Sequence, residues 1–197
     1  MGFERPDDGQ IVVAYKVIDS SEARKHVNQR VVMISQSAMV VEALTVQQNV
    51  EYAFHLREDY DESNIQDVVA GMLQIGDLYE LRTLKASDLP FAQRRMLAFL
   101  HALANQPECI LFDEPTAELD PLLSRKLCEF MLRLKHELRL TMLLPTNDLD
   151  LTRQFADKVL FLDRGRVVFV GHPEEFFHMS RLPGGAVFAY GERLATL

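Results

Sequence analysis

The stretch Glu108-Cys-Ile-Leu-Phe-Asp-Glu-Pro-Thr-Ala-Glu-Leu-Asp-Pro121 decides the fold. Cys109 to Phe112 is a short apolar run, which is typical of a buried strand. Two carboxylates, Asp113 and Glu114, follow directly at its carboxyl end. Ligands of open α/β sheets bind beyond the carboxyl ends of the strands. An acidic pair there is suited to hold Mg²⁺ through water and to orient an attacking water at a phosphate.

The same stretch predicts a helix after the acidic pair. Asp120 and Pro121 are expected to open it as N-cap residue and first-turn proline, and apolar residues continue at helical spacing to Leu138. A polar strand end followed by a capped helix is the structural alternative. We favour the functional interpretation because one mechanism requires every element of the run.

The run from Leu111 to Pro121 resembles the Walker B strand and D-loop of ATP-binding-cassette (ABC) transporter ATPases. The resemblance extends from Pro6 to about Phe177. The other segments that match the family pattern are Pro6-Asp-Asp-Gly-Gln-Ile11, Gln36 after the apolar run Val31–Ser35, Leu44-Thr-Val-Gln-Gln-Asn-Val50, and Ala156 to Glu175.

This resemblance implies ATP and Mg²⁺ as cofactors. Gln36 corresponds to the Q-loop glutamine, which with Asp113 would hold the metal ion. Glu114 stands at the position of the general base, and Asp120 belongs to the nucleotide-binding D-loop. Because other parts of the family pattern are altered, we expect Glu114 to be inactive and nucleotide to bind weakly or not at all.

The resemblance also implies the fold. We expect one α/β domain over residues 1–197, with a P-loop-NTPase-like core sheet, helices on both faces and a helical subdomain over about 41–103. The strand Cys109–Phe112 should lie near Leu140–Leu144 in a parallel arrangement, since a helix of suitable length joins them. Thr45 and Gln48 predict a capping box for the helix that begins at Val46. The remaining predicted strands are Gln10–Tyr15, Val31–Ser35, Val159–Leu162 and Val167–Val170.

The phosphate-binding loop is the first departure from the family. The G-x-x-x-x-G-K-[ST] pattern does not occur, and Gly71 and Gly76, which have the glycine spacing, lie in a helical pattern. In the family this loop precedes the strand that corresponds to Gln10–Tyr15. We therefore expect a degenerate or N-terminally truncated member that lacks the P-loop strand and helix. Without that strand, Cys109–Phe112 is expected to have an unpaired edge.

Two further departures lie inside the chain. The signature loop, L-S-G-G-Q in the family, is replaced by Leu89, Pro90, Phe91, Ala92 and Gln93. Proline has no hydroxyl, and phenylalanine is too bulky for the close approach of a backbone to a phosphate. Asn147 stands at the position of the switch histidine, and its amide can bind a phosphate but cannot carry a proton.

Composition limits the kinds of partner and the cellular location that we expect. The formal net charge of −8 and a pI of about 5.2 argue against nucleic acid. Cys109 and Cys128 lie in apolar segments and are expected to be reduced thiols, which fits the cytosol. No apolar stretch approaches the roughly 20 residues that span a bilayer. We expect no direct membrane insertion, and a place on the cytoplasmic face of the membrane through a permease subunit.

The favoured function is a catalytically impaired ABC subunit that acts as a structural or regulatory partner of a permease or of another ABC ATPase. Three alternatives remain. The chain could be a fragment of a longer ATP-hydrolysing subunit that energises transport, with lipid as one cargo. It could also be an ATPase with another phosphate-binding mode, or a binding module outside transport. The predicted partner contact is made by three apolar residues, Met39, Val40 and Val41. The alternative is that these side chains pack on the helical subdomain.

Overall fold

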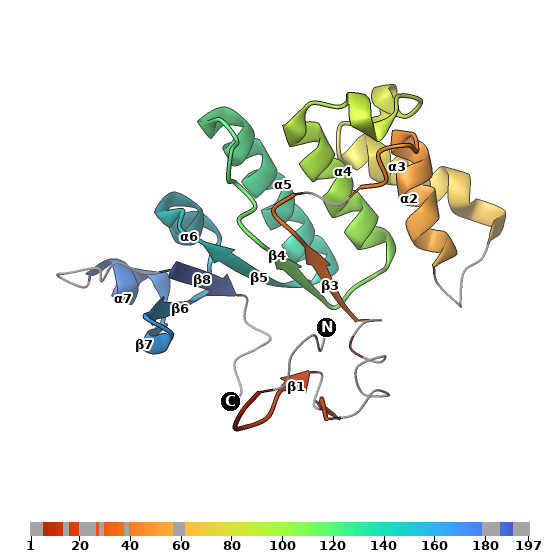
Figure 1. The fold of residues 1–197 in the computed structure, drawn as a ribbon. Helices are drawn as coiled ribbons and strands as arrows, with labels where there is room; N and C mark the ends of the chain where they lie inside the picture. Colours follow the sequence, from red (N-terminus) through yellow and green to blue (C-terminus); the bar gives the residue numbers. More distant parts are fainter. Residues whose placement is uncertain are drawn as a thin grey trace.

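A computed structural model describes residues 6–13, 16–19, 27, 30–37, 40–56, 62–178 and 186–190. In these ranges the larger sheet has six strands in the order β3-β4-β5-β8-β6-β7 (Figure 1). Its strands are β3 (Val31–Ile34), β4 (Cys109–Phe112), β5 (Thr141–Thr146), β6 (Lys158–Asp163), β7 (Arg166–Gly171) and β8 (Ala186–Tyr190). The helices are α2 (Val46–His55), α3 (Ile65–Ile75), α4 (Phe91–Ala104), α5 (Pro121–Leu138), α6 (Leu149–Phe155) and α7 (Pro173–His178), and short 3₁₀ turns cover Glu62–Asn64, Tyr79–Leu81 and Ala86–Asp88.

The predicted parallel pairing of the central strands is confirmed. β4 pairs in parallel with β3 on one side and with β5 on the other, and Ile110 lies opposite Met142. α5 connects β4 to β5, as the sequence predicts for a parallel crossover. The carboxyl ends of the three strands therefore meet at one edge of the sheet.

The prediction that Cys109–Phe112 has an unpaired edge is wrong. β3 and β5 occupy both sides of β4, and the strand beside β5 on its other side is β8, which runs antiparallel to both β5 and β6. β6 then forms the predicted hairpin with β7. A segment late in the sequence thus joins the two halves of the sheet.

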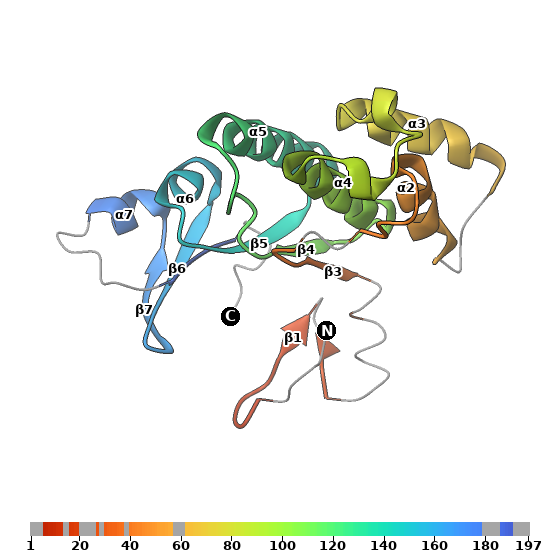
Figure 2. The same ribbon diagram turned by 45° about the horizontal axis from the view of Figure 1, so that its top comes forward.

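The two faces of the sheet differ in cover. Ile110, Phe112, Met142 and Leu144 are buried on the face that packs against the helices. Figure 2 shows the labelled helices on that one side of the sheet. On the other face Met33 is 43% exposed. The described helices named above lie on one face of the sheet.

Local signals determine where the helices begin. Thr45 and Gln48 form the predicted capping box of α2, with a Thr45 Oγ1 to Gln48 N distance of 3.1 Å. Asp120 Oδ1 accepts hydrogen bonds from the backbone N–H groups of Leu122 and Leu123 at 2.9 and 3.0 Å, so α5 begins at Pro121 as predicted. α2, α3 and α4 lie side by side in Figure 1, in the region predicted to be a helical subdomain.

The start of the chain differs from the expectation. Within the described part of the predicted strand Gln10–Tyr15, β1 covers Val12–Val13 and pairs with β2 (Lys16–Val17) in a small separate sheet. Ala14 and Tyr15 lie outside the described residues.

The two cysteines are free thiols, and burial raises the pKa of each to about 11, so both stay protonated at neutral pH.

Candidate functional site

The carboxyl edge of β3 and β4 holds a cavity of about 650 Å³. It is lined by Ser35, Gln36, Ser37, Phe91, Arg94, Asp113 and Glu118. Gln36 and Asp113, which the sequence predicted as metal ligands, are therefore brought to one cavity. The strand register explains this, because Ile34 lies opposite Phe112 and the N–H of Asp113 donates to the carbonyl of Ile34 at 3.0 Å.

The donor set of this cavity suits a magnesium ion only in part. An amide oxygen from Gln36 and a carboxylate from Asp113 are oxygen ligands that Mg²⁺ prefers. Among the residues that the structure describes, no three His, Cys, Asp or Glu side chains gather to hold a metal by themselves. Mg²⁺ is usually bound by one or two carboxylates together with water and substrate phosphates. These residues thus fit Mg²⁺ that arrives with a phosphate ligand.

Glu114 is not among the residues that line this cavity, and its carboxylate is bound by other parts of the protein. Its carboxylate accepts three hydrogen bonds, from Thr146 Oγ1 at 3.0 Å, from the backbone N–H of Asn147 at 3.2 Å and from Asn147 Nδ2 at 3.1 Å. The backbone of Glu114 has a φ of 45°, an uncommon left-handed conformation for a residue with a side chain. Asn147 is thereby placed against the carboxylate at the predicted general-base position.

Asp148 supports this contact, although the sequence analysis did not single it out. Its Oδ1 caps α6 through the N–H groups of Asp150 and Leu151, and its Oδ2 accepts from Thr116 Oγ1 at 2.9 Å. The N–H of Asp148 in turn donates to Thr146 Oγ1 at 3.0 Å. An aspartate directly before an apolar helical segment is an N-cap signal, so its capping role was visible in the sequence.

The predicted D-loop aspartate serves the helix in this structure. Both hydrogen bonds of Asp120 go to the first turn of α5, and Asp120 does not line the cavity of Gln36 and Asp113. Its predicted role at a nucleotide stays a prediction.

The signature positions are divided between two places. Leu89 is buried, Pro90 is the N-cap residue of α4, and Phe91 lines the cavity of Gln36 and Asp113. Ala92 and Gln93 instead line a second cavity of about 510 Å³ beside α5. Of the five predicted signature residues, Phe91 is thus the one that lines the first cavity.

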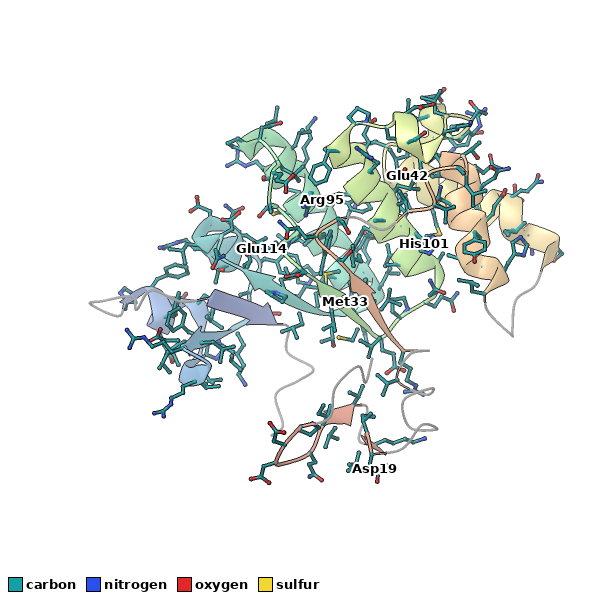
Figure 3. All side chains as sticks on the ribbon, viewed as in Figure 1. Asp19, Met33, Glu42, Arg95, His101 and Glu114 are labelled. Carbon is teal, nitrogen blue, oxygen red and sulfur yellow. The ribbon has the colours of Figure 1, made fainter. Side chains whose placement is uncertain are left out.

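Arg95 is a site residue that the sequence analysis missed. It lies on α4 with 0% exposure, and its guanidinium donates to the carbonyls of Glu114 and Pro115 through Nη1 and of Gln36 through Nη2. Arg95 and Glu114 are both labelled in Figure 3. Burial lowers the pKa of Arg95, while the charges of Glu118 and Glu114 raise it. The only sequence signal is that Arg95 falls among apolar helix positions, where a charge is uncommon.

None of the helices in the described ranges is long and apolar enough to cross a membrane. This agrees with the absence of a long apolar run in the sequence.

Comparison with known proteins gives the family. The ABC transporter family model matches residues 1–117. The chain is 30% identical over 168 residues to "Methionine import ATP-binding protein MetN" of Coxiella burnetii, covering 84% of this chain and 48% of that protein. It is also 30% identical over 176 residues to "Arginine transport ATP-binding protein ArtM" of Bacillus subtilis, covering 89% and 73%. The chain thus spans about half the length of the methionine import relatives it matches.

Solved structures agree with the fold. CbiO1 from Clostridium perfringens, described as part of the ABC transporter complex cbiONQ, superposes with a TM-score of 0.82 at 26% identity, covering 90% of this chain and 71% of that one. The ATP-binding cassette MJ0796, a dimer bound to ADP and Pi, superposes with a TM-score of 0.73 at 23% identity, covering 86% and 75%. The matched sequence, the parallel sheet and these relatives together lead to one conclusion: the chain belongs to the ABC transporter ATPase family.

Proposed function

We propose that this chain is an ABC transporter component whose ATP hydrolysis is impaired and which acts as a structural or regulatory partner of a permease or of a second ABC ATPase. One observation carries the proposal: the carboxylate of Glu114 accepts three hydrogen bonds from Thr146 and Asn147. A general base must offer a lone pair to the attacking water within hydrogen-bond reach. Three donors on one carboxylate compete with that water.

The altered signature supports the same proposal. Phe91 stands where a glycine N–H would approach a phosphate, and Pro90 brings neither an N–H nor a hydroxyl. A dimer partner's ATP would meet a phenyl ring at this point. Asn147 also lacks the imidazole proton that a switch histidine supplies.

Cofactor binding is proposed at the cavity of Gln36 and Asp113. These two residues would hold the Mg²⁺ of an ATP, and the metal ion would offset phosphate charge. The chain's own contribution is the placement of two oxygen donors across β3 and β4. Asp113 and Glu118 also bring negative charge to this cavity, which disfavours a polyphosphate that arrives without a cation.

The partner surface is proposed around Val41, on the cytoplasmic face of a membrane. Val41 is 40% exposed, whereas Val40 is partly buried and packs against the core. Met39 lies outside the described residues. Buried Asn49 accepts from the N–H of Val41 at 2.7 Å and donates to its carbonyl at 3.0 Å, which fixes the direction of this segment before α2. A fixed, exposed apolar side chain suits a permanent contact.

ATP turnover and association together test the proposal. Turnover of Mg·ATP is measured for the purified chain, for its Asn147→His variant and for its complex with whatever permease and ATPase subunits are encoded nearby. We expect no turnover by the chain alone and a complex that forms equally with and without ATP. Val41→Asp should weaken the complex, while Val168→Asp, which replaces a 48% exposed valine on β7, should leave it intact. Turnover by the unmodified chain, or association that requires ATP, contradicts the proposal.

A second candidate, an ATP-hydrolysing subunit that energises transport, is favoured by the common cavity of Gln36 and Asp113. The turnover assay separates it from the first. Lipid as the cargo stays a prediction, and the names of the relatives refer instead to methionine and arginine.

A further inference from the structure

The guanidinium of Arg95 connects two segments that carry the site. Nη1 donates to the carbonyls of Glu114 at 2.6 Å and Pro115 at 2.7 Å, and Nη2 donates to the carbonyl of Gln36 at 3.2 Å. Gln36 is separated from Arg95 by 59 positions and Glu114 by 19. One side chain on α4 thus fixes the ends of two neighbouring strands relative to each other.

The surroundings of Arg95 show that this contact is an internal one. The residue is 0% exposed, and its Nε has no hydrogen-bond partner among the described residues. The ring of Phe91 lies against the guanidinium, at 4.7 Å from ring centroid to Cζ. Burying a charge with one donor unsatisfied is unfavourable, so the remaining contacts must offset it.

Glu114 is the residue whose geometry needs support. Its φ of 45° is costly for a side-chain-bearing residue, and conformations of this kind persist where neighbours hold them. Arg95 binds the carbonyl of Glu114, while Thr146 and Asn147 bind its carboxylate. Without Arg95 the carbonyl would keep only the N–H of Ala117 as a donor, at 3.1 Å, and the peptide could rotate and carry the carboxylate away from Asn147.

We propose that Arg95 is a positioning residue that holds Gln36 and Glu114 at a fixed spacing in the absence of nucleotide, with Phe91 covering its charge. The phenylalanine at the signature position then has a use of its own: it shields the cation that sets the site. This inference goes beyond the proposed function and does not depend on whether the chain hydrolyses ATP.

Hydrogen exchange of the full chain, without nucleotide, tests the spacing. Arg95→Lys keeps the charge but not the planar fork, and Arg95→Met removes the donors. Arg94→Met is the matched control on the same helix turn. In both Arg95 variants we expect the amides of Asp113, Glu114 and Ala117 to exchange at least about tenfold faster than in the unmodified chain, with α6 and the β6–β7 hairpin unchanged. Arg94→Met should change neither set.

A spectroscopic readout separates positioning from general stability. Asn147 Nδ2 donates to Glu114, so the side-chain amide resonances of Asn147 report on the carboxylate. We expect them to move toward those of a solvated amide in Arg95→Lys and not in Arg94→Met. Uniform acceleration of exchange, or unmoved Asn147 resonances, overturns the proposal. If both Arg95 variants fail to fold, hydrogen exchange is measured in the Phe91→Gly variant instead. Unchanged exchange of the Ala117 amide in that variant also overturns the proposal. ATP turnover would contradict the proposed function alone.

Discussion

Two carboxylates that are neighbours in the sequence meet different surroundings. Asp113 faces an open cavity, and the structure gives its carboxylate no hydrogen bond from the residues it describes. Glu114 is equally half-buried, yet three donors surround its carboxylate and Arg95 holds its carbonyl. One carboxylate faces a cavity, and the other is part of the protein's own hydrogen-bond network. The difference teaches that two neighbours in one motif can have unlike surroundings when the backbone turns between them.

Replacing each carboxylate by alanine gives the largest effect. Glu114→Ala leaves Thr146 and Asn147 without their acceptor and should lower the free energy of unfolding by about 3 kcal/mol. Asp113→Ala removes no such bond and should cost less than about 0.5 kcal/mol. Urea unfolding followed by circular dichroism measures both. Equal losses would show that the two carboxylates are not distinct.

Thr146 sharpens the comparison at a smaller scale. It is buried, and its hydroxyl links Glu114 with the N–H of Asp148. Thr146→Val should cost about 1–2 kcal/mol because it leaves both partners unpaired. Thr141, another buried threonine of β5, has no side-chain hydrogen bond among the described residues, so Thr141→Val should be nearly neutral in the same unfolding experiment.

Asn147 gives the smallest expected change. Its side chain is exposed, and Asn147→Ala removes the Nδ2 bond while the backbone N–H still reaches Glu114. We expect a loss of no more than about 0.5–1 kcal/mol in the urea experiment. A loss as large as that of Glu114→Ala would place the control of this network at Asn147 instead of at Glu114.

Local signals were sufficient for much of the fold. The limits of α5 and α6, the capping box of α2 and the parallel pairing of β4 with β5 follow from caps, periodicity and the length of one crossover. The common cavity of Gln36 and Asp113 was also accessible, because both follow strand ends. The roles of these residues at a nucleotide stay predictions.

Non-local pairing explains what the sequence analysis missed. The order of strands depends on contacts between distant segments, so β8 and the pairing of β4 with β3 were not foreseen. The bond between Glu114 and Asn147 joins residues 33 positions apart. Arg95 was missed because a charged residue on a helix is ordinarily assigned to solvent.

The central place of β8 has a consequence for biosynthesis. β3, β4 and β5 can pair as they leave the ribosome, and β6 and β7 can form their hairpin. Within the sheet the two parts join through β8, the last of the described strands to be translated. Until then β5 and β6 each present an unpaired edge, which is the kind of surface that recruits strands from other chains. We therefore expect a nascent chain that stalls before Ala186 to leave the facing edges of β5 and β6 open to pairing with other chains.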